Sequence, residues 1–357
     1  MRRGYLEKGE LSMSNKVLIG MSGGVDSSVA AYLLKKEGYD VTGATMILTD
    51  DQSALDNAED AKKVCSQLDI PFITLEFKDL FESKVIDYFC NEYKSGRTPN
   101  PCVQCNKHLK FGAFFEKAKE LGFDFVATGH YAKIQLNPLT KKYEMRISNA
   151  LSKDQSYFLY NHTQETLSKT LMPLGKYNKD EVRSIAEEIG LNVASRPDSQ
   201  EICFIHDDDY VRFIKEQHSY TAPEGDFVDI SGNIIGRHSG IINYTIGQRK
   251  GLGAFGRPMF VMKIDAEKNQ ITLGEKGMEF DKELVASDLN FLAGNPPAEE
   301  FRCTAKNRYQ AKPAPCMVKI EGNKAIVTYD EPVRAITPGQ AIVFYEEDLL
   351  LGGGTVI

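Results

Sequence analysis

The first third of the chain alternates short apolar runs with amphipathic segments of helical period. The apolar runs predict strands at Lys16–Met21, Asp40–Ile47, Phe72–Phe77 and Asp124–Thr128. The amphipathic segments predict helices at Ser28–Glu37, Asp56–Leu68, Asp79–Lys94 and Lys107–Leu121. Strands separated by helices at this spacing indicate βαβ units and a parallel sheet, which binds ligands at the carboxyl ends of its strands.

The pattern changes after the fourth strand. A hairpin is expected at Lys133–Ile147 and a helix at Asn178–Glu188, where Asn178 and Glu181 form a variant of the capping box. From about Pro223 onward, Gly, Pro and short alternating runs are typical of small β domains. The predicted fold class is therefore α/β: an N-terminal Rossmann-like parallel sheet, a small central mostly-β domain and a C-terminal β-barrel. The expected domains are residues 14–215, 216–281 and 282–357.

Composition narrows the classes of protein further. The 357 residues are 42% hydrophobic and 26% charged, close to the globular average, which argues against disorder or a coiled coil. No apolar run approaches the roughly 18 residues that span a bilayer, so we expect no membrane protein. A net charge of −7 means that a nucleic-acid partner requires a local basic surface. Seven cysteines, an odd number, and no apolar signal segment favour reduced thiols in the cytoplasm.

The first dozen residues do not have the pattern of a fold. Met1–Ser12 are mostly polar and show no period. Lys8–Glu10 lie just ahead of Met13 and have the sequence expected of a translated ribosome-binding site. We therefore expect residues 1–13 to be an unstructured extension and Met13 to be the natural start.

The strongest chemical signal is Ser22–Ser28 (SGGVDSS), which directly follows a predicted strand and opens a helix. Adjacent glycines let the backbone approach a phosphate, and the N–H groups of a helix N-terminus favour an anion. The serines add hydroxyl donors, and Asp26 can orient a magnesium-bound pyrophosphate. No Gly-Lys-Ser/Thr occurs, so γ-phosphoryl transfer by a Walker A loop is disfavoured. Gly251–Gly256 formally matches GxGxxG, but no βαβ unit surrounds it, and we interpret it as a loop.

A second signal is a CxxC motif, Cys102 and Cys105, in the Pro-rich segment TPNPCVQCN ahead of the helix predicted to begin near Lys107. A helix N-terminus lowers the pKa of a thiol, and the nearby Lys107 makes Cys105 the expected more acidic thiol. A structural zinc usually needs four ligands, and no second CxxC exists. A thioredoxin-like pair should directly follow its own strand. We therefore favour reactive thiols in a substrate-facing loop, with no resident metal.

The other cysteines are less distinctive. Cys203 lies in an apolar run, PDSQEICFI, where the simplest interpretation is a buried small hydrophobic residue. The same interpretation is stronger for Cys65, Cys90, Cys303 and Cys316, which lie in ordinary helix or strand patterns.

Basic residues gather in one C-terminal stretch. Cys303–Lys319 contains Lys306, Arg308, Lys312 and Lys319, no acidic residue, and one aromatic ring, Tyr309. Lys107, His108 and Lys110 flank the CxxC, and Arg249 and Lys250 lie mid-chain. Basic residues beside an aromatic ring suit RNA, since the basic residues pair with phosphate and the ring stacks on bases. Solvated surface charge is the alternative.

Together these motifs resemble the bacterial tRNA 2-thiouridylases (tRNA-uridine 2-sulfurtransferases), which belong to the PP-loop ATP-pyrophosphatase superfamily. The resemblance is collinear over Ser14–Ile357. It rests on GMSGGVDSS (20–28), GRTPNPCVQCN (96–106), ATGHYA (127–132), LSKDQSYFL (151–159), DSQEICFI (198–205) and YTIGQRKGLG (244–253). The first motif is shared with the wider superfamily and the others are narrower.

The resemblance implies ATP-dependent 2-thiolation of the wobble uridine in tRNAs for Lys, Glu and Gln. It makes Cys105 the nucleophile and Cys203 the persulfide carrier, with a transient disulfide between them. The positions that correspond to ATP contacts are Gly20, Met21, Ser22, Gly23, Gly24, Val25, Asp26, Ser27, Met46 and Gly129. Those that correspond to target-base or tRNA contacts are Asn100, Pro101, Cys102, His130, Lys153, Asp154, Gln155, Arg308, Tyr309 and Gln340.

The resemblance also implies partners. ATP with Mg²⁺ and tRNA are the expected substrates, and a cysteine desulfurase or sulfur-carrier protein is the expected source of the persulfide. Some family members carry Asp where this chain has Cys102, so its role stays open, and many carry Lys where it has Arg196.

Two other classes of protein are weighed against this one. A different ATP-pyrophosphatase, such as an amidating or lysidine-forming synthetase, would use ammonia or an amine and would need no paired cysteines. A non-catalytic RNA-binding protein would have no use for SGGVDS. ATP–pyrophosphate exchange that depends on tRNA distinguishes the three.

Overall fold

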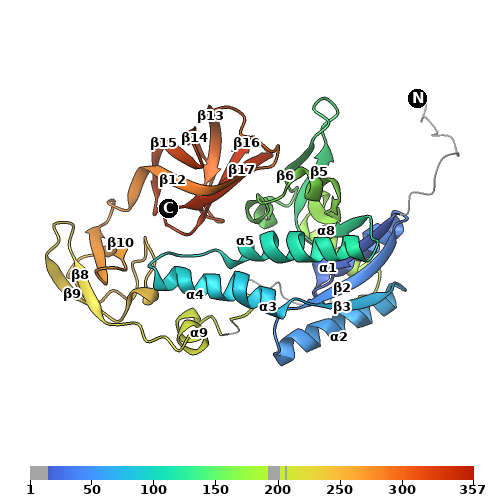
Figure 1. Cartoon of the computed structure of the whole chain (residues 1–357), viewed down its shortest axis with the longest axis horizontal. Helices are drawn as coiled ribbons and strands as arrows, with labels where there is room; N and C mark the ends of the chain where they lie inside the picture. Colours follow the sequence, from blue (N-terminus) through green and yellow to red (C-terminus); the bar gives the residue numbers. More distant parts are fainter. Residues whose placement is uncertain (1–14, 192–201, 206) are drawn as a thin grey trace.

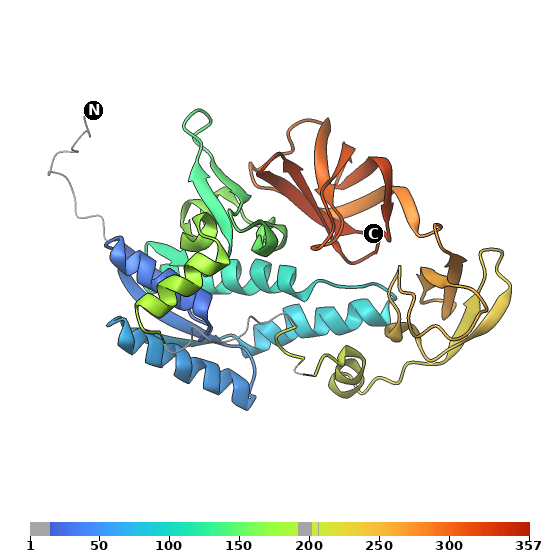
Figure 2. The same ribbon diagram turned by 180° about the vertical axis from the view of Figure 1, so that it is seen from behind.

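The structure is a computed structural model that describes residues 15–191, 202–205 and 207–357. The expected start at Met13, the N-terminal extension and Arg196 lie outside the described residues. Figure 1 shows a parallel sheet with its helices, a small β domain and a C-terminal barrel, with long helical segments running between them. Figure 2, from behind, again shows the sheet and the small β domain at opposite ends of these segments.

The parallel sheet has the strand order β3-β2-β1-β4-β7, and every neighbouring pair is parallel. Its strands are β1 (Lys16–Gly20), β2 (Asp40–Ile47), β3 (Phe72–Glu76), β4 (Phe125–Ala127) and β7 (Thr170–Leu171). The four predicted strands are confirmed. The strand order reverses between β1 and β4, and open α/β sheets bind ligands at such a switch point.

The helices that flank this sheet include α1 (Val25–Lys36), α2 (Gln52–Gln67) and α8 (Lys179–Glu188). Helix α1 begins earlier than predicted because extended Gly24 is already its N-cap. Helix α2 also begins earlier, because the Asp51 side chain caps it by accepting a hydrogen bond from the Ala54 N–H. The capping box predicted for α8 is confirmed.

Two long helical segments each contain a π-helical turn. The first comprises α3 (Lys78–Phe81), η1 (Glu82–Ile86) and α4 (Asp87–Lys94), and the second α5 (Pro101–Cys105), η2 (Asn106–Ala113) and α6 (Phe114–Glu120). We call the second segment the cysteine helix.

The predicted start of the cysteine helix near Lys107 is wrong. It begins at Pro101, because the Asn100 side chain accepts a hydrogen bond from the Val103 N–H and Pro101 occupies the first helical position. The CxxC therefore lies in the first turns of a helix rather than in a loop before it.

A glycine makes the π-helical turn of the cysteine helix possible. A Cβ atom at Gly112 would lie 2.9 Å from the Lys107 carbonyl oxygen, closer than real side chains approach a backbone. The turn ends where the Phe114 N–H donates to the Leu109 carbonyl oxygen, in the i to i+5 pattern of a π-helix. Such turns are rare and are frequent at functional sites.

The C-terminal barrel closes through β12. Its strands are β12 (Phe280–Phe291), β13 (Glu300–Lys306), β14 (Ala314–Glu321), β15 (Lys324–Arg334), β16 (Ala341–Glu346) and β17 (Leu349–Val356). The order β12-β15-β14-β13-β16-β17 is closed by pairing of β12 with β17. The predicted hairpin, β5 (Ala132–Leu136) and β6 (Tyr143–Ile147), is confirmed. It extends the barrel sheet, because β6 pairs with β17.

The small β domain has the strand order β10-β11-β8-β9. Its strands are β8 (Gly225–Val228), β9 (Ile234–His238), β10 (Met259–Asp265) and β11 (Gln270–Glu275), preceded by helix α9 (Tyr210–Gln217). It shares one apolar core with α4, in which Phe89 and Tyr93 accompany Ile242 and Val261. Gly251–Gly256 lies outside helices and strands, as predicted.

The remaining elements are short: α7 (Gln164–Ser168), η3 (Leu151–Lys153), η4 (Ser156–Phe158), η5 (Pro173–Lys176) and η6 (Ile241–Asn243). In the described part of the chain, no helix combines the length and the apolar character needed to cross a membrane.

The variant Gly112→Ala tests the π-helical turn. In an ordinary helix interior this change stabilises by up to about 1 kcal/mol. Here we expect the opposite sign and a loss of about 1 kcal/mol or more, because the added methyl group collides with the backbone at Lys107. Urea unfolding measures the difference, with Lys107→Ala as a control on the same turn. A more stable Gly112→Ala protein would show that the turn tolerates a side chain.

Candidate active site

The SGGVDSS segment comprises the end of the loop after β1 and the first turn of α1, and we call it the phosphate loop (Ser22–Ser28). Gly24 is the N-cap of α1, with φ −96° and ψ 171°, and no side chain caps the helix. Gly23 has φ +72°, and a Cβ atom there would lie 2.9 Å from the Asn57 carbonyl oxygen. The Ser28 hydroxyl donates to the Gly24 carbonyl at 2.7 Å. This helix N-terminus, bordered by glycines and hydroxyl groups, suits an anion such as phosphate.

The loop after β4 lies directly against the phosphate loop. A Cβ atom at Gly129 would lie 2.7 Å from the Ser27 nitrogen and 2.8 Å from the Asp26 carbonyl carbon, so only glycine allows this approach. Met46 lies near the end of the neighbouring strand β2. The structure thus brings the predicted ATP contacts Gly20–Ser27, Met46 and Gly129 to one edge of the sheet.

Asp26 of the phosphate loop is held by two residues that sequence analysis missed. The Lys179 ammonium donates to both carboxylate oxygens, at 2.8 and 2.9 Å, and the Tyr131 hydroxyl donates to one of them at 2.8 Å. Lys179 is the first residue of α8, and its side chain is 12% exposed. No local sequence signal could have found the Lys179–Asp26 ion pair, because 153 positions separate the two residues.

Three cysteines share a second site, near the start of the cysteine helix. Cys102 and Cys105 lie in α5, and Cys203 lies in the segment Ile202–Ile205, which we call the Cys203 loop. Cys102 and Cys203 are exposed and Cys105 is buried. Cys203 is therefore not the buried small hydrophobic residue that its apolar run taken alone suggests. The neighbouring thiols of Cys105 and Cys102 help to raise the pKa of Cys203, which places the three groups within electrostatic range of one another.

The lowered pKa expected for the thiols of the CxxC is wrong, whereas the expectation that Cys105 is the more acidic of the two stays a prediction. Loss of hydration raises the pKa of Cys105, and the nearby Cys102 raises it further. The pKa of Cys102 is also raised, and that of Cys203 rises to about 12. Cys102 and Cys203 remain accessible, yet enough protein surrounds them to hinder hydration of a thiolate. The physical reason for the error is that desolvation outweighs the helix N-terminus.

One cation opposes this desolvation at all three thiols. The Lys110 ammonium lowers the pKa of Cys102, of Cys105 and of Cys203. Its Nζ lies 3.5 Å from Nε2 of His130, and Nδ1 of that ring lies 2.8 Å from the Thr128 hydroxyl. His130 follows Gly129, so the segment that contacts the phosphate loop also contacts the cysteine helix.

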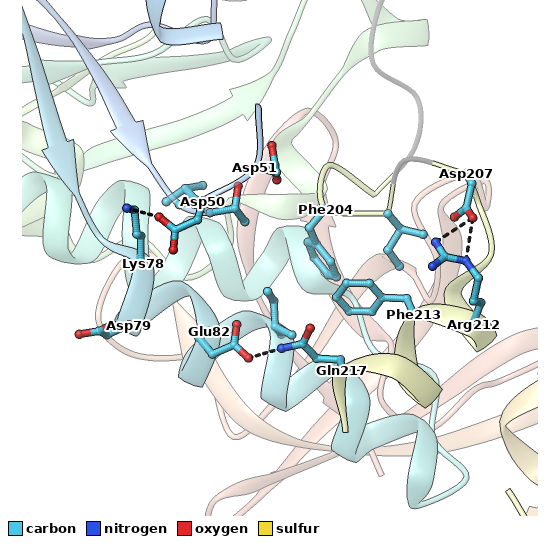
Figure 3. A pocket seen from close by; sticks show the side chains of 14 residues that line it. Asp50, Asp51, Lys78, Asp79, Glu82, Phe204, Asp207, Arg212, Phe213 and Gln217 are labelled. Carbon is cyan, nitrogen blue, oxygen red and sulfur yellow. Dashed lines mark hydrogen bonds and ion pairs between the residues drawn. The ribbon is translucent and has the colours of Figure 1, made fainter. Parts of the chain in front are cut away.

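Aromatic packing anchors the Cys203 loop. The Phe204 ring contacts Phe81 at 5.6 Å, Phe89 at 5.5 Å and Phe213 at 5.2 Å between ring centroids. Phe204 and Ile205 of this loop form part of the wall of a cavity of about 580 Å³. Figure 3 shows Phe204 and Phe213 beside each other in this cavity.

Four of the charged groups that line this cavity form two ion pairs. Asp207 pairs with Arg212, and Lys78 pairs with Asp50 (Figure 3). None of the residues predicted to bind ATP or tRNA lines this cavity.

The segment Lys153–Gln155 is connected to the phosphate loop through Tyr131, whose hydroxyl donates to Asp26. The Gln155 side-chain oxygen accepts from the Tyr131 N–H at 2.9 Å. The Asp154 carboxylate accepts from the Ser148 N–H and from the Ser156 hydroxyl, while burial raises its pKa. The carboxylate of Asp154 and the amide of Gln155 therefore stabilise the backbone here.

The predicted contacts from the barrel lie at its junctions with the other domains. Arg308 donates to the Ile246 carbonyl at 2.9 Å and also bonds the Thr337 hydroxyl. The Gln340 amide donates to the carbonyls of Thr98, at 2.9 Å, and Pro99, just ahead of the cysteine helix.

Tyr309 packs on Phe158, with ring centroids 4.5 Å apart, and Lys306 lies over its ring. Tyr309 and Lys306 thus join the barrel to the segment that follows Gln155.

The other four cysteines lie outside the phosphate loop, the cysteine helix and the Cys203 loop. Cys65 and Cys90 are buried in helices α2 and α4. Cys303 and Cys316 are directly opposite on β13 and β14, with their sulfur atoms 3.6 Å apart. Within residues 15–191, 202–205 and 207–357, no three His, Cys, Asp or Glu side chains are grouped to hold a metal ion.

Fold and site together define a class of protein. The chain is a PP-loop α/β enzyme, with its phosphate loop at the switch point of a parallel sheet and two β domains appended. Three family models match it: "tRNA methyl transferase HUP domain" over residues 15–207, "tRNA methyl transferase PRC-barrel domain" over 212–275, and "Aminomethyltransferase beta-barrel domain" over 281–356.

Its relatives specify the family. The tRNA-specific 2-thiouridylase MnmA of Clostridioides difficile is 51% identical over 355 residues, covering 96% of this chain and 98% of that protein. The MnmA proteins of Acetivibrio thermocellus and Clostridium beijerinckii are each 49% identical, covering 96% of this chain and 99% of theirs. The chain belongs to the tRNA 2-thiouridylase family.

The variant Phe204→Ala tests the anchoring of the Cys203 loop. Removing a ring buried among three others should destabilise the protein by about 3 kcal/mol and accelerate alkylation of Cys203 by iodoacetamide. Phe204→Leu, which keeps most of the apolar volume, should cost less than about 1.5 kcal/mol. Urea unfolding and peptide mass spectrometry measure the two effects. Unchanged stability and alkylation in Phe204→Ala would mean that the ring does not hold the loop.

Proposed function

We propose that this chain adds sulfur to carbon 2 of the wobble uridine in tRNA, at the expense of ATP. One observation supports this most directly: a single short segment joins the two sites. Gly129 contacts the phosphate loop, and His130 contacts Lys110 of the cysteine helix. A nucleotide-activated oxygen and a sulfur nucleophile have to meet in this reaction, and here their sites adjoin.

The chemistry explains why both sites are needed. The carbon-2 carbonyl of uridine is a poor electrophile, and its oxygen is a poor leaving group. Attack of that oxygen on the α-phosphorus of ATP releases pyrophosphate and leaves an adenylate, which departs later as AMP. An amidating or lysidine-forming enzyme would activate its substrate in the same way, but it would need no thiols. Three neighbouring cysteines therefore favour sulfur transfer.

Sulfur transfer then proceeds between two cysteines. The terminal sulfur of a Cys203 persulfide attacks carbon 2, AMP leaves, and the base is joined to Cys203 through two sulfur atoms. The Cys105 thiolate attacks Sγ of Cys203, so the bond between the two sulfur atoms breaks and 2-thiouridine is released. The products are the thiolated base and a Cys105–Cys203 disulfide, which a dithiol reductant returns to two thiols.

The phosphate loop fits a magnesium-bound nucleotide. Its helix N-terminus would receive the phosphates, and Asp26 is the carboxylate that would hold Mg²⁺, which binds through few protein ligands and the phosphates themselves. Bound Mg²⁺ would offset phosphate charge. Lys179 and Tyr131 fix the direction of the Asp26 carboxylate.

The substrate is a base that leaves its stack. An oxygen can be activated only where it reaches the phosphate loop, and extrusion is easiest in an unpaired loop such as the anticodon. By family resemblance we propose the tRNAs for Lys, Glu and Gln. A cysteine desulfurase or sulfur carrier would load Cys203, and the cytoplasm supplies tRNA, ATP and reduced thiols together. Asn100, Pro101 and Cys102 would line the flipped base.

The cysteine variants separate the proposed steps. Cys203→Ser should bind ATP and tRNA but acquire no protein-bound sulfane sulfur. Cys105→Ser should load sulfur on Cys203 yet form little 2-thiouridine, because nothing cleaves the persulfide. Cys102→Ala should keep measurable activity. Labelled sulfur followed on a non-reducing gel and then in tRNA measures all three, with Cys303→Ser in the barrel as the control. An inactive Cys102→Ala beside an active Cys105→Ser would reverse the two roles.

The tRNA surface can be tested without disturbing the fold. Reversal of Arg308 is unsuitable, because its guanidinium joins two domains. Arg249, Lys250 and Lys312 are exposed. Their joint reversal to Glu should weaken tRNA binding at least about tenfold and flatten its salt dependence, because fewer counterions are released.

The control for this experiment carries the same change of charge elsewhere. Lys36, Lys62 and Lys63 are exposed on α1 and α2, and reversing them should leave tRNA affinity nearly unchanged. Filter binding at several salt concentrations compares the two triple variants. Equal losses in both would move the tRNA surface elsewhere.

A further inference from the structure

Lys110 lies on the same side of its helix as Cys105 because of the π-helical turn. In an α-helix of 3.6 residues per turn, a residue five positions on lies about 140° around the axis from where it started. A π-helix bonds residue i to residue i+5, so five positions bring the chain back to nearly the same face. The turn η2 (Asn106–Ala113) follows Cys105 directly, and Lys110 is the fifth residue after it. The π-turn thus aligns the ammonium with the cysteine.

The Lys110 ammonium is held by a neutral histidine. Burial, together with Lys110 and His162, lowers the pKa of His130 well below its usual value. The neutral His130 ring can accept a hydrogen bond from the Lys110 ammonium at Nε2 only if its own proton is on Nδ1. That Nδ1–H then donates to the Thr128 hydroxyl. Thr128, His130 and Lys110 therefore form a chain of hydrogen bonds from the end of β4 to the cysteine helix.

This chain lies between the two reactants. Thr128 and His130 flank Gly129, whose backbone is in contact with the phosphate loop at Ser27. In the proposed reaction two negatively charged species would approach Lys110: the attacking thiolate or persulfide from the cysteine helix, and the departing phosphate from the phosphate loop. A fixed cation stabilises both without reorganising as the charge develops.

The electrostatic surroundings of the thiols contain little else that favours a thiolate. Desolvation is the largest influence on the pKa of each thiol, and it raises all three. Cys102 raises the pKa of Cys105, and both raise the pKa of Cys203. Lys110 is the charged side chain that opposes these effects at all three. Lys107 and Lys84 act instead on His108.

We propose that Lys110, oriented by His130, is the positioning residue that keeps the cysteine site reactive and neutralises the charge that develops between sulfur and phosphate. This role rests on the proposed thiolation, since it assigns Lys110 a place in that reaction. It gives the π-turn a function: a regular α-helix would carry the same lysine to another face.

The direct test measures thiol reactivity in the absence of tRNA, ATP and sulfur donor. Iodoacetamide alkylation of Cys102, followed by peptide mass spectrometry from pH 6.5 to 10, reports its thiolate. In Lys110→Gln the midpoint of the rate profile should move to higher pH, because loss of the cation raises the pKa of the thiol. At neutral pH alkylation should slow by about tenfold, because a smaller fraction of the thiol is ionised once the cation is lost.

Two matched variants control this test. Lys107→Gln removes a charge from the same turn and should keep the wild-type profile, and Lys110→Arg should retain most of the reactivity. Thermal melting confirms that each variant is folded. A Lys110→Gln profile that coincides with the wild type would overturn the proposal, whatever becomes of the thiolation reaction.

A second measurement separates charge from structure. In single-turnover thiolation, Lys110→Gln should be slow at pH 7 and regain much of its rate at pH 9, where thiolates form without the cation. A loss that is equal at both pH values would indicate a merely structural role and reject the proposal. Failure of the wild-type protein to thiolate tRNA would instead contradict the proposed function, and the alkylation result would still stand.

Discussion

The close approach of two backbones at the switch point of the parallel sheet determines the geometry of both sites. Gly129 leaves no room for a side chain against Ser27 and Asp26, so the loop after β4 lies in contact with the first turn of α1. One residue later, His130 reaches the cysteine helix through Lys110. The carboxyl edge of the sheet and the cysteine helix are thus connected through one short segment, Thr128–His130.

The cysteine site balances two opposing physical requirements. Sulfur transfer to an adenylated base benefits from exclusion of water, which would otherwise hydrolyse the activated carbon. Exclusion of water also disfavours the thiolate, and the raised pKa values of Cys102, Cys105 and Cys203 record that penalty. A single cation, Lys110, opposes part of this penalty, and the π-helical turn that Gly112 permits carries it. The barrel also holds the start of the cysteine helix, because the Gln340 amide donates to the backbone carbonyl of Thr98 just ahead of it.

Patterns over a few neighbouring residues predicted the strands and loops. They could not predict contacts between residues that are far apart in the sequence. The four strands, the phosphate loop and the hairpin follow from periodicity and from glycine placement within a few residues. The start of the cysteine helix was misjudged because its cap, Asn100, lies between two prolines that suggest a loop. Lys179 on Asp26 and His130 on Lys110 depend on strand order, which periodicity does not encode. The π-turn has no sequence signature besides Gly112, so the orientation of Lys110 could not be foreseen.

The central claim is that one site couples adenylation of the base to sulfur transfer. The most direct measurement incubates the purified protein with tRNA, ATP and a persulfide donor, and then counts AMP, pyrophosphate and 2-thiouridine by mass spectrometry. Our account predicts one AMP and one pyrophosphate for each 2-thiouridine formed, and no 2-thiouridine when ATP is omitted. Formation of 2-thiouridine without AMP, or AMP with an amine-containing nucleoside in its place, would contradict it.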